Sequence, residues 1–120
     1  MLNIVVPLKI VSSANLNEHW TQKIKRKNLH KNAIAKEFLY LNSNIPTVPC
    51  RITLSRIAPR LLDEDNLLYA LKTCRDVVCD MVLPGLRMGR ADASSQIRVE
   101  YNQEKSKNNF YALRIIIESE

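Results

Sequence analysis

A chain of 120 residues with 46% apolar content can bury one hydrophobic core, so we expect a single domain that spans residues 1–120. Two glycines are too few for Gly-rich phosphate loops or flexible linkers, and no internal repeat occurs. The 18 Lys and Arg residues outnumber the 12 Asp and Glu residues, and the net charge of +6 favours a polyanionic partner such as nucleic acid.

The start of the chain predicts a strand, and we expect no export signal there. Residues 2–8 are apolar and end near Pro7, as a short strand does. Residues 1–11 are too few to span a bilayer, and they lack the positive region and cleavage site of a signal peptide. We therefore expect a cytoplasmic protein that does not enter a membrane.

A polar stretch over residues 12–20 leads into a predicted helix that starts near Lys23. Apolar residues then recur at spacings of three and four, and Pro46 follows the pattern. These apolar residues are Leu29, Ala33, Ile34, Phe38 and Leu41.

The start of this helix is strongly basic, because residues 23–37 contain no acid before Glu37. A solvated helix face would explain such a run, since charge runs are usually that. A second basic cluster at Arg87 and Arg90 favours a DNA-binding groove instead. The predicted DNA-binding residues are Lys23, Lys25, Arg26, Lys27, Lys31, Arg87 and Arg90.

Three other side chains near the basic run are candidates for contacts. Trp20 is a candidate either for stacking on bases or for the core. His19 and His30 lack a helical His partner, so we expect them to contact solvent or phosphate rather than a metal.

The middle of the chain predicts a strand and a second helix. Residues 51–57 alternate, with Ile52 and Leu54 on one side and Thr53 and Ser55 on the other. A helix is predicted from about residue 64 to residue 82, with Asp63 as its N-cap and Pro84-Gly85 beyond its end. Its core-facing residues are Leu67, Leu71, Cys74, Val78 and Met81, and its opposite side carries Asp65, Tyr69, Lys72 and Asp76.

The last third of the chain contains two alternating segments, residues 97–101 and 111–117, which we interpret as a hairpin. The fold class is therefore α/β or α+β, with a single mixed sheet of about four strands covered by two helices. Cys50, Cys74 and Cys79 form no CxxC pair, so we expect free, buried thiols.

Residues 63–66, Asp-Glu-Asp-Asn, form a cluster of carboxylates in a basic chain. Helix capping explains Asp63 and Asp65 without any chemistry. The alternative is a Mg²⁺ ion that bridges carboxylates and substrate phosphates. That site needs a third ligand, and Asp92, just before a predicted strand, is the best candidate.

Lys72 lies on the same helix stripe as Asp65 and Tyr69. Its ammonium could stabilise the charge that develops on a phosphoryl group bound at the carboxylates. The alternative is an exposed Lys72 that pairs with Asp76, four residues on.

The order of these segments resembles the RusA family of Holliday junction resolvases over nearly the whole chain. The likeness consists of a short strand, a Ser/Asn segment at residues 12–20, a basic helix and a strand. Asp-x-Asp-Asn-Leu at residues 63–67 then opens a helix, and Asp92 precedes a later strand.

This resemblance implies a RusA-like fold and a homodimeric, Mg²⁺-dependent endodeoxyribonuclease of phage or prophage origin. Such an enzyme cuts four-way (Holliday) DNA junctions in recombination and repair by phosphodiester hydrolysis. Carried over by position, Asp63, Asp65 and Asp92 would be the catalytic metal ligands. The chain departs from the family at Tyr69, where the family has a functional Lys, so Lys72 is the candidate substitute. It also has a single Asp92 where the family commonly has an acidic doublet.

Two other classes of protein are considered. A non-catalytic DNA-binding protein of the same fold would use the acids only to cap a helix, and it would bind junction DNA without Mg²⁺. An RNA-binding module is disfavoured, because no strand carries the aromatic pair that stacks bases.

Overall fold

The computed structural model describes residues 1–11, 20–40, 45–84 and 95–120. The elements, in chain order, are β1 (Leu2–Val6), α1 (Trp20–Leu39), β2 (Cys50–Ala58), α2 (Glu64–Val82), β3 (Ile97–Lys105) and β4 (Ala112–Ser119). A single mixed sheet of four strands with two helices forms an α+β fold, which confirms the predicted fold class.

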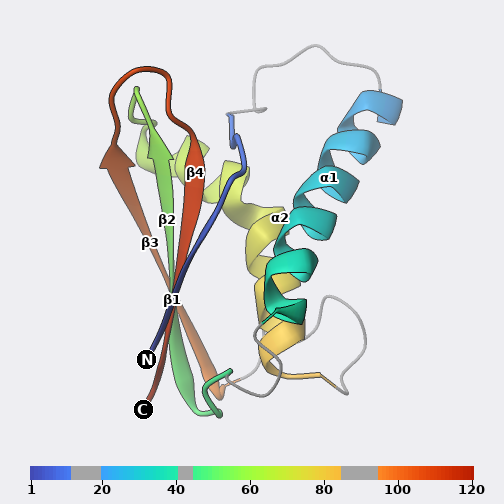
Figure 1. Cartoon of the computed structure of the whole chain (residues 1–120), viewed down its shortest axis with the longest axis vertical. Coiled ribbons are helices and arrows are strands. Elements are labelled where there is room, and N and C mark those ends of the chain that lie inside the picture. Colours follow the sequence, from blue (N-terminus) through green and yellow to red (C-terminus); the bar gives the residue numbers. More distant parts are fainter. Residues whose placement is uncertain (12–19, 41–44, 85–94) are drawn as a thin grey trace.

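The two helices lie on the same side of the sheet (Figure 1). The strand order is β1-β4-β2-β3, with β4 antiparallel to both of its neighbours and β2 parallel to β3. Ile4, Ile115, Leu54 and Tyr101 lie side by side across the four strands. Because side chains alternate between the faces of a strand, this row and every second row beside it face the helices.

The predicted hairpin of the last two strands is wrong. β2 lies between β3 and β4, and the connection from β3 to β4 passes the end of β2, where the Ser106 amide donates to the Ala58 carbonyl at 2.9 Å. Asn108 and Asn109 turn this connection with φ of 55° and 58°, a left-handed conformation that Asn tolerates better than most residues. Alternation identifies a strand but does not identify its neighbour.

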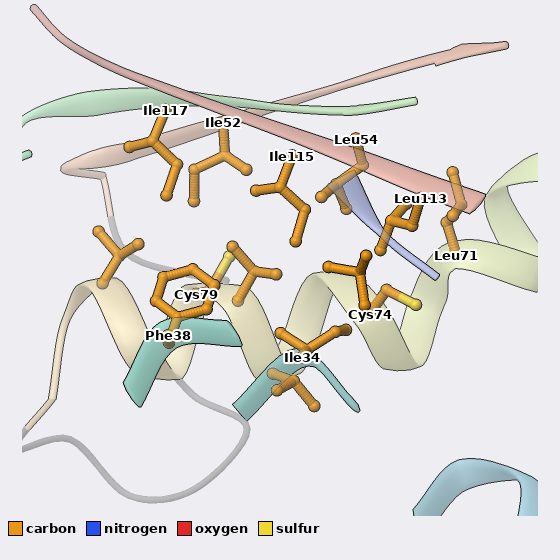
Figure 2. Close-up of a cluster of buried hydrophobic side chains, with 14 of the residues drawn as sticks. Ile34, Phe38, Ile52, Leu54, Leu71, Cys74, Cys79, Leu113, Ile115 and Ile117 are labelled. Atoms are coloured by element: carbon orange, nitrogen blue, oxygen red, sulfur yellow. The ribbon is translucent and has the colours of Figure 1, made fainter. Parts of the chain in front are cut away.

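The core fills the layer between the helices and the sheet (Figure 2). Its largest fully buried side chains include Ile34 from α1, Leu71 from α2 and Ile115 from β4. The three cysteines are free and buried, as predicted. Burial raises the pKa of Cys74 to about 12, so this thiol stays protonated and packs as a small apolar group.

Two predictions for the side chains of α1 are wrong, although Ile34 and Phe38 are buried as predicted. Leu29 is 64% exposed, whereas His30 is 5% exposed and lies on the buried side of the helix with Ile34 and Phe38. His30 therefore contacts neither solvent nor phosphate. Trp20 is 65% exposed, which excludes it from the core.

The sheet face turned away from the helices is held together by paired charges. Arg114 Nε donates to Glu104 Oε2 at 2.9 Å, and Ser55 Oγ donates to the same carboxylate at 2.8 Å. Arg51 and Glu118 form a second ion pair on this face. Among the described residues, no helix is long and apolar enough to cross a membrane.

Candidate nucleic-acid interface

The acidic segment at the start of α2 caps the helix. Asp63 has an extended backbone (φ −69°, ψ 166°), and its Oδ1 accepts a hydrogen bond from the Asn66 amide at 3.0 Å. Glu64 and Asp65 are exposed in the first turn, where carboxylates oppose the positive end of the helix dipole. The capping interpretation of Asp63 is confirmed. Capping through Oδ1 is compatible with metal binding through the second oxygen, because a carboxylate accepts at both.

Two side chains of the sheet fix the segment just before this N-cap, and sequence reasoning missed both. The Gln103 amide donates to the Leu62 carbonyl and accepts from the Leu62 amide, both at 2.7 Å. Buried Arg56 donates to the Arg60 carbonyl at 2.7 Å and to the Ile10 carbonyl at 2.8 Å. The available signal was that Arg56 follows Ile52 and Leu54 on the apolar side of the predicted strand.

The predicted third acid, Asp92, lies outside the described residues, as do Arg87, Arg90 and His19. Within the described ranges, no group of three or more His, Cys, Asp or Glu side chains could hold a metal ion. Asp63 and Asp65 are exposed carboxylates, the kind of oxygen ligand that Mg²⁺ takes together with waters and substrate phosphates.

The predicted basic run of α1 and the polar stripe of α2 meet in one cavity. The cavity has a volume of about 140 Å³ and lies between the two helices. We call it the helix-pair pocket; its lining residues are Lys23, Arg26, Lys27, Tyr69 and Lys72. The spacings of three and four along α1, and of three along α2, put these side chains on the facing surfaces of the helices.

A direct contact joins the two helices in this pocket. Lys23 Nζ donates to the Tyr69 hydroxyl at 3.2 Å and lies 5.9 Å from the centre of the Tyr69 ring. An ammonium from α1 therefore stands beside the residue that is one turn after Asp65, about 6 Å along the helix axis. The sequence had suggested Lys72 as the cation near the carboxylates, and it gave no sign that Lys23 contacts Tyr69.

Two other predicted DNA-binding residues lie outside this pocket. Lys25 and Lys31 are exposed on α1 and do not line the helix-pair pocket. Lys72 lines the pocket, and Asp76 lies 3.5 Å from the Arg75 Nε.

His30 lies one turn after Arg26, and the charge of Arg26 affects its pKa. Burial lowers the pKa of His30, and the positive charge of Arg26 lowers it further, whereas a hydrogen bond to the backbone of Lys9 opposes the shift. His30 is therefore a buried neutral residue behind the cationic surface and has no part in binding phosphate.

A larger groove of about 600 Å³ lies between α2 and β3. Glu64, Leu67 and Leu68 line it from α2, and residues 100–103 line it from the strand. Its two carboxylates, Glu64 and Glu100, make it unsuitable for a polyanion. The two sides of α2 thus differ in charge.

Comparison of the chain with protein-family models, with curated proteins and with solved structures found no match. The resemblance to the RusA family stays a prediction from the residues that carry it.

Proposed function

We propose that this chain is a DNA-binding protein that uses the helix-pair pocket and cuts four-way DNA junctions in a Mg²⁺-dependent reaction. The observation that carries the proposal is the convergence of Lys23, Arg26, Lys27 and Lys72 from two helices on one pocket. Such a cluster suits the phosphates of a nucleic acid, which dominate the affinity of most DNA-binding proteins. The carboxylates of Asp63 and Asp65 begin the same helix.

Each part of this surface has a separate role in the proposed reaction. Asp63 and Asp65, with Asp92, would hold Mg²⁺, which when bound supplies positive charge to the scissile phosphate and an activated water. The pocket cations hold and orient the DNA backbone beside these carboxylates. Lys72 and Lys23 add positive charge where negative charge develops on the phosphoryl group.

A four-way junction presents two strands to be cut, so we also propose that the protein acts as a symmetric homodimer. Two copies related by a twofold axis carry two equivalent sets of carboxylates. A DNA substrate inside the cell is in keeping with a cytoplasmic protein that acts in recombination and repair.

The second candidate function is that of a non-catalytic DNA-binding protein of the same fold. The hydrogen bond from the Asn66 amide to Asp63 favours it, because capping alone explains that acid. Under this alternative the pocket would bind junction DNA, and no metal would be required.

A cleavage assay on a synthetic four-way junction separates the two candidates. We expect paired cuts in the presence of Mg²⁺ and binding without cuts in EDTA. Linear duplexes with the sequences of the arms are the control, and they should stay intact. Junction binding without cleavage under both conditions would select the non-catalytic protein, and a failure to bind junctions at all would refute both.

A further inference from the structure

The helix-pair pocket gathers like charges in a small volume. Among the described residues, its lining consists of four cationic side chains and a phenol, with no carboxylate. Positive side chains that converge from two helices attract an anion into the space between them.

The size of the pocket limits that anion. Pockets that enclose drug-sized ligands measure about 300–1,000 Å³, so a cavity of about 140 Å³ is too small for a whole nucleotide. A single tetrahedral phosphate is small enough to enter a cavity of this volume.

We propose that the helix-pair pocket binds one phosphate group of a polynucleotide and that it does so without a metal ion. The inference deepens the proposed function, on which it rests for the polynucleotide that carries the phosphate.

The donors suit a phosphate held from two sides. Arg26 offers a planar guanidinium that can donate two parallel hydrogen bonds, whereas the lysines act as point charges. The hydroxyl of Tyr69 accepts from Lys23 Nζ at 3.2 Å and so holds that ammonium at the pocket. Because α1 and α2 each contribute donors, the site exists only when the two helices are packed together.

The test titrates the ¹⁵N-labelled full chain with inorganic phosphate in EDTA, at constant ionic strength, and follows the amide resonances by NMR. We expect shifts concentrated in the first half of α1 and around residues 69–72. Lys23→Ala, Arg26→Ala and Lys72→Ala should each weaken phosphate binding by about fivefold or more, because each removes a charge-assisted hydrogen bond.

Lys36→Ala is the matched control, because Lys36 is exposed in the last turn of α1 and does not line the pocket. It removes the same charge from the same helix, and it should change the affinity by less than about twofold. An equal loss in Lys36→Ala and in the pocket variants, or shifts spread over lysines elsewhere, would overturn the phosphate site.

Short oligothymidylates with and without a 5′-phosphate then identify the source of the group. A gain in affinity from the 5′-phosphate that Arg26→Ala removes would assign a terminal monoester to the pocket. Equal binding of both strands, weakened by the same variant, would assign an internal diester. Strands that bind Arg26→Ala as well as they bind the parent would refute the pocket as a polynucleotide site.

The phosphate site and the proposed nuclease function can be rejected separately. Phosphate binding that depends on the pocket, together with no cleavage of junctions, would retain the phosphate site and reject the nuclease. Mg²⁺-dependent cleavage by a protein whose phosphate affinity is unchanged in the pocket variants would retain the nuclease and reject the site.

Discussion

The acidic start of α2 and the cationic pocket beside its second turn are neighbours, yet they arise in different ways. The acids are a local feature, since Asp63 caps the helix through an amide three residues away. The pocket is a tertiary feature, because Lys23 of α1 reaches Tyr69 of α2 across 46 residues of sequence. The opposite charges thus have separate structural origins, and each can be changed without the other.

We expect the largest effect from Asp65→Asn, which changes the acidic start of α2 and leaves the pocket intact. The amide keeps the size of the side chain and removes the charge that a metal needs. We expect junction cleavage in Mg²⁺ to fall by about a hundredfold or more, the scale on which removal of one electrostatic partner acts. Junction binding should be preserved or strengthened, because the substitution removes a charge that repels phosphates. Cleavage by the variant at the parental rate would remove Asp65 from the metal site.

The pocket is tested by the triple substitution of Lys23, Arg26 and Lys27 with Ala. Junction binding should weaken by about tenfold or more, and the slope of log affinity against log salt should become shallower by about 0.9 for each duplex phosphate that the protein no longer neutralises. The matched control replaces Lys36, Lys105 and Lys107, which are exposed and outside the pocket. Equal salt slopes in the two triple variants would mean that the basic run is a solvated face.

The capping role of Asp63 predicts an effect on stability that is separate from cleavage. Asp63→Ala should lower the free energy of unfolding by about 1 kcal/mol, because the Asn66 amide loses its acceptor. Asp63→Asn keeps an acceptor and should change stability by a few tenths of that amount, while still removing the metal charge. Urea unfolding of both variants checks this, and equal losses of stability would show that charge rather than capping is responsible.

The smallest expected effect is the pH dependence caused by His30. Its pKa is lowered in the folded protein, so the unfolded chain binds more protons in the interval between the two pKa values. Stability is therefore complete above the unfolded pKa of about 6.5 and is lost as the pH falls toward the folded value, at no more than about 1.4 kcal/mol per pH unit. His30→Gln should flatten the dependence between about pH 7 and pH 5. An unchanged slope in this variant would assign the titration to another group.

Local signals allowed the helices and strands to be predicted, and they failed for one side chain position on α1. The capping residue and the apolar period correctly predicted α2, because both depend on neighbours within a few residues. The apolar period on α1 selected Leu29 rather than His30, since it ranks residues by polarity and not by how a helix packs.

Pairing across the chain was beyond these signals. Alternation could not reveal that β2 separates β3 from β4, because partners depend on the topology of the whole sheet. The helix-pair pocket could not be predicted for the same reason. The sequence of each helix shows its own stripe of polar residues, but it does not show which stripe of the other helix lies opposite. Asp92 lies outside the described residues, so its place in the metal site stays a prediction.

The position of β4 has a consequence for how this molecule folds. β4 is the last strand along the chain, yet it joins β1 to β2, so Leu2 finds its partner only at Ile117. Contacts between residues so far apart in sequence require a long loop to close before any stabilisation is gained. We expect slow folding compared with a helical bundle of the same length. During synthesis on the ribosome, β1 has no strand to pair with until β4 has emerged. The edge of β2 that pairs with β4 also stays unpaired until then.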